Sequence, residues 1–170
     1  MDKYNIDELE QLAKSSLSES RYKHTLGVAK LAKEIASFND VDEEKAYVAG
    51  LLHDITKEKD EAWHDDMLRK HNDLVKLKAP CKIKHSYTAK YFAMDFLNIN
   101  DPEILDAMYN HTICMSDAKL AKIIYIADKR EENRKIDSGE GELAKRDLDK
   151  AYKLVFDDVT RYIKLKGNDK

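Results

Sequence analysis

The sequence is poor in the residues that interrupt helices, with only five glycines and two prolines among 170 residues. Both residue types are unfavourable inside helices, so their scarcity leaves room for long helical segments. Few segments show the alternation of apolar and polar residues that half-buried strands require. The two absences together predict an all-α protein.

Cysteines and long apolar runs are also scarce. Cys81 and Cys114 lie far apart without CxxC spacing, which predicts free thiols in a reducing compartment. No apolar run approaches the roughly 18–20 residues that span a bilayer. The N-terminus lacks the apolar core of a signal peptide. We therefore expect a cytoplasmic protein with no membrane partner.

Neither sign of charge dominates the sequence. Lys and Arg number 30 and Asp and Glu number 33, for a net charge of −3, and the two signs are interspersed. The chain has no long stripe of basic residues, so the sequence does not indicate a nucleic-acid partner. A chain of 170 residues can bury a core of its own, and no repeat or linker divides it, so we expect one domain over residues 1–170.

Apolar residues recur with the helical period and predict about seven or eight helices. Ser18, Asp42 and Asp117 are expected N-caps, and Pro102 is expected at the first position of its helix. The last helix could serve the core or an interface between two copies of the chain. The expected helices cover residues 5–17, 18–38, 42–54, 60–71, 83–97, 101–111, 117–131 and 141–166.

One apolar run, residues 46–52, ends in an adjacent histidine and aspartate, His53 and Asp54. A charge buried without a partner is costly. A metal ion would explain the pair, because imidazole and carboxylate are both metal ligands and a cation reverses the penalty on the carboxylate. The alternative is a helix that simply ends at this pair in water.

Further ligand-type side chains lie on the apolar faces of other predicted helices. A lone inward histidine is more often a satisfied core residue, but bundle folds build metal sites from facing helices. Four histidines and two aspartates exceed what one tetrahedral zinc uses, whereas two metals that share a carboxylate would use all six. Mixed imidazole and carboxylate ligation favours iron or manganese. The six candidate ligands are His24, His53, Asp54, His85, His111 and Asp128.

Two further histidines, His64 and His71, lie among charged residues. We assign both to the surface.

The order of these residues carries a resemblance to a known family. His24, then His53-Asp54, then Asp128 resembles the signature of the HD superfamily of metal-dependent phosphohydrolases. Residues 21–25, 50–54, 109–112 and 122–128, with Asn133-Arg134 beyond them, resemble the bacterial YqeK family of symmetrical diadenosine tetraphosphate hydrolases. The resemblance covers about residues 20–135, and it implies an HD-domain helical bundle.

The resemblance also implies how the ligands are divided. His24, His53, Asp54 and Asp128 would hold one metal, and His85, His111 and a bridging Asp54 would hold the second. The cofactors would be two divalent or trivalent ions, iron first, with manganese, cobalt and magnesium as alternatives. A metal-bridging hydroxide would cleave diadenosine tetraphosphate into two molecules of ADP.

Cationic side chains are expected to bind the phosphates of this nucleotide substrate. Asp54 and Lys57 are the expected catalytic residues. The expected phosphate-binding residues are Arg21, Lys57, Arg130 and Arg134. Lys57 and Arg130 have an alternative interpretation as solvated charges.

The loop at residues 113–116 lacks the glycine and arginine that are usual in the resembled family. Two other functions therefore stay open. One is another HD phosphohydrolase, acting as a nucleotidase or on an alarmone, and the other is a non-catalytic nucleotide-sensing module. A homodimer is also possible.

Overall fold

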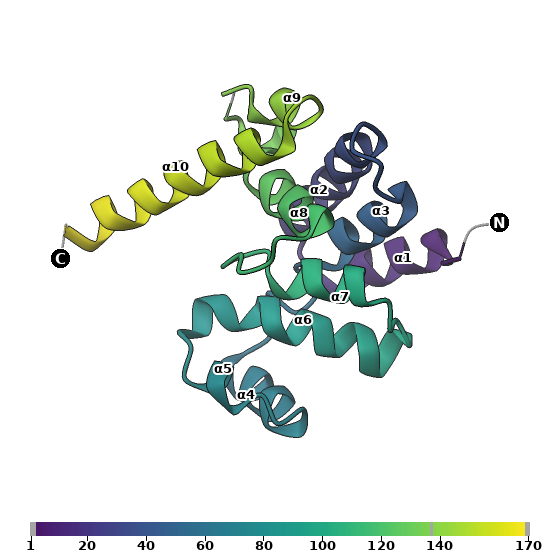
Figure 1. The fold of residues 1–170 in the computed structure, drawn as a ribbon. Coiled ribbons are helices and arrows are strands. Elements are labelled where there is room, and N and C mark those ends of the chain that lie inside the picture. The colour runs from purple at the N-terminus through teal and green to yellow at the C-terminus, as the bar shows by residue number, and fades with distance from the viewer. Residues whose placement is uncertain (1–2, 137, 169–170) are drawn as a thin grey trace.

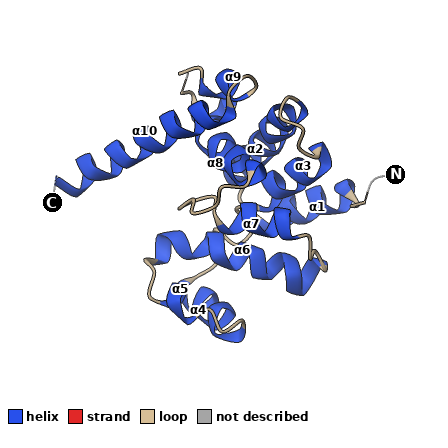
Figure 2. Ribbon diagram, viewed as in Figure 1, coloured by secondary structure: helices blue, strands red, loops and turns tan. Residues whose placement is uncertain are grey.

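The structure, a computed structural model, describes residues 3–136 and 138–168. Within these residues it contains ten α-helices, one short 3₁₀ helix and no strand (Figure 2). The predicted all-α fold is confirmed. The α-helices are α1 (Ile6–Ser16), α2 (Glu19–Ser37), α3 (Glu43–Leu52), α4 (Glu61–Lys70), α5 (Leu74–Leu77), α6 (Cys81–Leu97), α7 (Pro102–Tyr109), α8 (Lys119–Arg130), α9 (Glu140–Ala144) and α10 (Leu148–Asn168), and the 3₁₀ helix η1 is Glu132–Arg134.

The structure has two helices more than the expected eight. The short helix α5 lies between the expected helices 60–71 and 83–97. The expected C-terminal helix is divided into α9 and α10 at Asp147, whose carboxylate accepts the backbone N–H of Lys150 at 3.1 Å. Its carbonyl oxygen also accepts the N–H of Ala151. Asp147 therefore acts as an N-cap inside a stretch whose apolar period is continuous.

The expected helix starts are partly confirmed. Asp42 accepts the N–H of Lys45, and Pro102 occupies the first turn of α7. Ser18 precedes α2, but its hydroxyl donates to Glu58 and makes no capping bond. The expectation for Asp117 is wrong, because α8 begins at Lys119, after Ala118.

Helices α2, α3 and α8 lie at the centre of the fold, with α6 and α7 beside them (Figure 1). The large core cluster draws buried apolar side chains from α1, α2, α3, α6, α7, α8, α9 and α10. A smaller cluster of Met67, Leu68, Tyr87 and Tyr91 joins α4 to α6. The central helices are therefore fixed on several sides, and it is these helices that carry the candidate ligands.

A glycine sets the spacing between α2 and α3. A Cβ on Gly50 would lie 2.7 Å from the Cα of Ala29 and 2.9 Å from its backbone nitrogen. Backbone atoms cannot move aside as a flexible side chain can, so only glycine permits this approach. Gly50 lies one turn before His53, so the close contact brings the end of α3 near α2.

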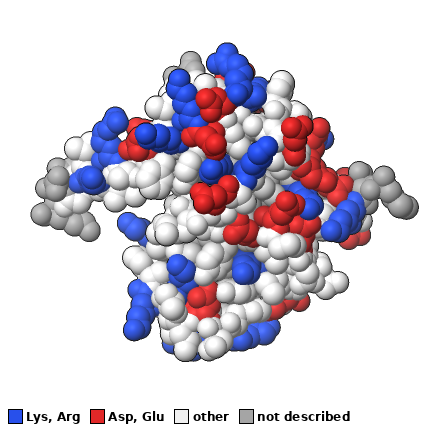
Figure 3. All heavy atoms as spheres, in the orientation of Figure 1, with Lys and Arg blue, Asp and Glu red and all other residues white. Residues whose placement is uncertain are grey.

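The far half of α10 projects from the rest of the fold (Figure 1). Basic and acidic side chains are interspersed over the face in Figure 3, which shows no extended surface of one sign. In the part of the chain that the structure describes, no helix combines the length and the hydrophobicity needed to span a membrane.

Candidate metal centre

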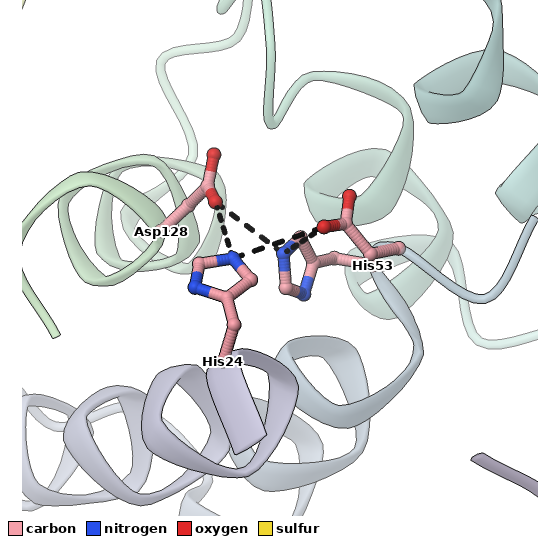
Figure 4. A group of neighbouring side chains, drawn as sticks. His24, His53 and Asp128 are labelled. Atoms are coloured by element: carbon pink, nitrogen blue, oxygen red, sulfur yellow. Dashed lines mark hydrogen bonds and ion pairs between the residues drawn. The ribbon is translucent and has the colours of Figure 1, made fainter. Parts of the chain in front are cut away.

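Five separate parts of the fold bring the predicted ligands together. His24 lies in the second turn of α2, and His53 caps the C-terminal end of α3 with Asp54 beside it. The remaining three come from α6, from the turn after α7 and from the end of α8. Figure 4 shows the side chains of His24, His53 and Asp128 pointing toward one another from different helices. All six ligand residues are buried: His24, His53, Asp54, His85, His111 and Asp128.

The first group of ligand atoms comes from His24, His53, Asp54 and Asp128. Nε2 of His24 lies 3.0 Å from Oδ1 of Asp128 and 3.7 Å from Oδ2 of Asp54. Nε2 of His53 lies 3.4 Å and 3.5 Å from the same two oxygens. Ligands bound to one ion at roughly 2.0–2.2 Å are separated by about these distances. The four atoms therefore fit around one cation.

The second group comes from Asp54, His85 and His111. Oδ1 of Asp54 lies 3.2 Å from Nε2 of His85 and 3.3 Å from Nε2 of His111. Because Oδ2 of Asp54 faces the first group, the two oxygens of this carboxylate face different groups. Asp54 is thus the residue that the two groups share.

The other ring nitrogen fixes the orientation of each imidazole. Each Nδ1 faces an oxygen that can accept its hydrogen, so each neutral ring can present the lone pair of Nε2 to a cation in the cluster. The Nδ1 contacts are His24 with Oε1 of Glu131 at 3.0 Å, His53 with the carbonyl of Gly50 at 2.6 Å, His85 with that of Lys82 at 3.0 Å, and His111 with that of Met108 at 2.7 Å.

One atom of the cluster has no partner. Nε2 of His53 is fully buried and makes no hydrogen bond with any described residue. Neutral imidazole nitrogens bind transition metals, and their second nitrogen usually donates to a carbonyl or carboxylate. A cation at the first group would satisfy this nitrogen, so the donor set fits a metal.

The two carboxylates attract positive charge to the cluster. Burial would lower the pKa of His53, but Asp54 and Asp128 outweigh it and raise the pKa. Burial would raise the pKa of Asp54, but the imidazoles of His53, His111 and His85 outweigh it and hold the pKa well below its usual value. Burial likewise opposes ionisation of Asp128, and Lys129 and His24 lower its pKa despite this. Burial lowers the pKa of His111 to about 4, against the opposing effect of Asp54. Both carboxylates are therefore ionised at neutral pH, and the imidazole of His111 is neutral.

Two of the predicted phosphate-binding arginines lie at the cluster. Arg21 donates to Oδ2 of Asp54 at 2.9 Å, and Arg134 donates to Oδ1 of Asp128 at 3.2 Å. Both line an open pocket of about 350 Å³ that reaches His24. Their side chains are 30% and 41% exposed, so each guanidinium can meet a ligand from solvent.

Lys57 lies on the side of the second group. Its Nζ is 3.4 Å from Nδ1 of His85, which is closer to the carbonyl of Lys82. A carbonyl can only accept, so we assign the hydrogen of this Nδ1 to the bond with Lys82. Burial lowers the pKa of Lys57, although Asp54 partly opposes the shift.

The structure does not support the role predicted for Arg130. Its guanidinium is buried and pairs with Glu140 and Asp158, the latter at 2.7 Å. These pairs join the end of α8 to α9 and α10. They occupy the guanidinium N–H groups that would otherwise bind phosphate.

The surface assignment of His64 is wrong. This histidine is 2% exposed, and its Nδ1 lies 2.9 Å from Oγ1 of Thr88. Trp63 and the α4–α6 contact cover it, although its sequence neighbours are charged. His71 is half-buried, stacks on Tyr91 and pairs with Asp95.

Two contributors to the cluster were missed by sequence reasoning. Lys129 donates to Oδ2 of Asp128 at 3.0 Å and to the carbonyl of His111. Glu131 accepts the hydrogen of Nδ1 of His24 and is 1% exposed. Both lie in the charged segment after Asp128, which looks like a solvated run. Its nearness to a predicted ligand was the one available signal.

Comparisons with known proteins agree with this geometry. A family model described as "HD domain" matches residues 21–133. A crystal structure of a predicted HD superfamily hydrolase involved in NAD metabolism, from Clostridium acetobutylicum, superimposes with a TM-score of 0.87 and 29% identity. The match covers 96% of this chain and 89% of that one.

Two bacterial proteins are also similar in sequence. A Staphylococcus aureus protein named symmetrical bis(5'-nucleosyl)-tetraphosphatase is 36% identical over 78% of this chain and 69% of its own length. A Mycoplasma genitalium protein named probable nicotinate-nucleotide adenylyltransferase/Ap4A hydrolase is 33% identical over 89% of this chain. This chain spans only 45% of the length of the Mycoplasma protein. The resemblance found in the sequence is confirmed.

Proposed function

The chain belongs to the HD-domain family, and we propose that it is a metal-dependent hydrolase that cleaves diadenosine tetraphosphate symmetrically into two molecules of ADP. The observation that carries the proposal is the convergence of six buried ligands into two groups that share Asp54. The names of the tetraphosphatase relatives support the choice of substrate.

The proposed cofactors are two cations, with iron first and manganese, cobalt or magnesium as alternatives. His24, His53, Asp54 and Asp128 would hold one, and Asp54, His85 and His111 would hold the other. Two such cations supply Lewis-acid charge to phosphoryl oxygens and lower the pKa of bound water. Imidazole with carboxylate ligation supports the order of preference.

The side chains of this chain have separate tasks in the proposal. Asp54 is ionised and holds the two groups in register through its two oxygens. Arg21 and Arg134, in the open pocket beside His24, bind the phosphates through guanidinium hydrogen bonds. Lys57, beside His85, binds phosphate on the other side of the cluster.

Product identification tests the proposal directly. The full chain, loaded with Fe²⁺ or Mn²⁺, is incubated with diadenosine tetraphosphate and the products are separated. We expect ADP as the only nucleotide product. ATP with AMP would contradict symmetrical cleavage.

The same protein is then tested with nucleoside monophosphates and guanosine polyphosphates. Turnover of these alone would favour the other HD phosphohydrolases. Metal binding without turnover of any nucleotide would favour a sensing module.

A homodimer through α10 forms part of the proposal, with a second copy of the chain as the partner. Tyr162, Ile163 and Leu165 on the projecting part of α10 are 57–63% exposed. An antiparallel pair of these helices would bury the apolar side chains of both copies against each other, as a self-complementary two-fold contact does. Light scattering should give twice the chain mass, and the double variant Tyr162→Ser, Ile163→Ser should give the monomer mass.

We further propose that residues 1–170 act as one cytoplasmic domain. The large core cluster, with members from α1 to α10, supports the single domain. Cys81 and Cys114 are both free thiols, which supports a reducing location.

A further inference from the structure

We propose that Glu131 is a positioning residue for the cation at His24, and that it makes the first group of ligands bind metal more tightly. The inference rests on the metal binding in the proposed function. It extends that proposal to a residue outside both ligand groups and to a difference between the two metal positions.

The contact between Glu131 and His24 is unlike those of the other ligand histidines. Oε1 of Glu131 accepts the hydrogen of Nδ1 of His24 at 3.0 Å. The corresponding nitrogens of His53, His85 and His111 face neutral backbone carbonyls. His24 is thus the ligand histidine whose ring is held by a charged group. A carboxylate in this place fixes the ring and increases the basicity of the nitrogen that binds metal.

The second oxygen of Glu131 is held as firmly as the first. Oε2 accepts the backbone N–H of Asn133 and its side-chain amide, each at 2.8 Å. The same amide also donates to the carbonyl of Lys23 at 3.3 Å, which ties the segment after α8 to α2. The carboxylate therefore cannot turn away from His24 without breaking both bonds to Asn133.

A glycine in α2 makes room for this carboxylate. Gly27 lies three residues after His24, and a Cβ there would be 2.1 Å from Oε2 of Glu131 and 2.9 Å from its Cδ. Glycine inside a helix is less favourable than alanine, so its presence there calls for a local reason. The close approach of Glu131 explains why the residue at position 27 has no Cβ.

The charge of Glu131 has no other cation to pair with. Its side chain is 1% exposed, and no Lys or Arg among residues 3–136 and 138–168 forms an ion pair with it. Its hydrogen-bond partners, His24 and Asn133, include no Lys or Arg, and a buried charge without a cation beside it is costly. A cation on the far nitrogen of His24 would compensate this charge through the ring.

Titration of the metal-free chain with Mn²⁺ tests the inference. Isothermal titration calorimetry of the wild type should resolve two binding steps, one lost in His24→Ala and the other in His85→Ala. Glu131→Gln keeps the shape of the side chain and removes its charge. We expect it to weaken the His24-dependent step by about 10–100-fold and to leave the other step unchanged.

The matched control is Glu132→Gln, which removes the same charge from the next, exposed residue. It should bind Mn²⁺ as the wild type does in both steps. The melting temperature of each metal-free variant is measured in parallel, since a purely structural role would lower it and weaken both steps alike.

A glycine pair provides a second test that leaves Glu131 itself unchanged. Gly27→Ala should displace the carboxylate and weaken the His24-dependent step. In Gly141→Ala the new Cβ meets only Leu31 side-chain atoms at 3.8 Å, so Mn²⁺ binding should not change.

Mn²⁺ binding by Glu131→Gln that matches the wild type in both steps would overturn the inference, and so would equal weakening of both steps. Neither result would affect the proposed activity. Conversely, a wild-type protein that binds two Mn²⁺ and hydrolyses no nucleotide would contradict the proposed function and leave the role of Glu131 intact.

Discussion

Nε2 of His85 and Nε2 of His111 lie 3.0 Å apart, and Oδ1 of Asp54 lies 3.2 Å and 3.3 Å from them. The Nδ1 atom of each ring faces a backbone carbonyl, that of Lys82 or of Met108. When both rings are neutral and donate from Nδ1, the two Nε2 lone pairs face each other and repel, and a cation bound between them would turn this repulsion into ligation. The pair therefore points to a bound cation at the second group independently of any motif.

Replacing one of these histidines should remove one cation. His111→Ala should reduce the bound metal from two equivalents to about one and lower the hydrolysis rate at least about 100-fold, because part of the charge on the phosphoryl oxygens is no longer compensated. Metal content after dialysis and the initial rate measure the two effects. His71→Ala, which changes a histidine outside the cluster, serves as the control and should keep both equivalents. Two equivalents in His111→Ala would refute the two-cation assignment.

The arginines beside the cluster should act on substrate affinity. Arg21→Gln and Arg134→Gln should each raise KM for diadenosine tetraphosphate roughly 10–100-fold, as expected for the loss of a charge-assisted hydrogen bond to phosphate. Bound metal should not change. Steady-state kinetics and metal analysis are the measurements.

Arg130→Gln is the matched control, because Arg130 pairs with Glu140 and Asp158 and not with the ligands. Its KM should equal that of the wild type while its melting temperature falls. A raised KM in Arg130→Gln with normal values in the other two variants would reverse our assignment of these arginines.

The α2–α3 contact should be intolerant of a single methyl group. Gly50→Ala places a Cβ 2.7 Å from a backbone atom of Ala29, so the two helices must separate. We expect the free energy of unfolding to fall by about 3 kcal/mol. The carbonyl of Gly50 also holds His53, so metal content should fall as well. Urea denaturation measures the first effect, with Gly141→Ala as the control, and a stability equal to that of the wild type would contradict the contact.

His64 should make stability depend on pH. Burial lowers the pKa of His64 in the folded chain, whereas an unfolded histidine titrates near 6.5. As the pH falls below about 6.5 the unfolded state takes up a proton that the folded state does not, so folding stability decreases by at most about 1.4 kcal/mol per pH unit. His64→Gln cannot titrate and should lack this contribution.

Denaturation midpoints of the wild type and His64→Gln at pH 7.5, 6.5 and 5.5 test the effect. As the pH falls, the denaturation midpoint of the wild type should decrease more than that of His64→Gln. A constant difference would show that His64 does not titrate within this range.

The helical architecture was predictable because apolar residues that recur with period 3.6 are the direct sequence signal of helices with one buried face. The boundaries that failed depend on single contacts. Asp147 divides the last helix by capping α10, and Ala118 precedes α8 although Asp117 is the better capping residue. Such choices depend on which neighbour is present in the folded chain.

The convergence of the six candidate ligands could be predicted because each lies on an apolar face or ends an apolar run, where a polar or charged side chain has to be buried. His64 was missed because its neighbours in sequence are charged, whereas in the fold Trp63 and Thr88 lie against its ring. Glu131 was missed because it lies in a charged segment that looks solvated, although the fold buries it against His24, 107 residues away.

The most direct test of the account is the anomalous scattering of a crystal of the iron-loaded chain, measured on both sides of the iron edge. We predict two peaks. One should lie about 2.0–2.3 Å from Nε2 of His24 and of His53, and the other at a similar distance from Nε2 of His85 and of His111. A single peak, or peaks away from both pairs of imidazoles, would contradict the central claim that six ligands from five parts of the fold hold two cations through Asp54.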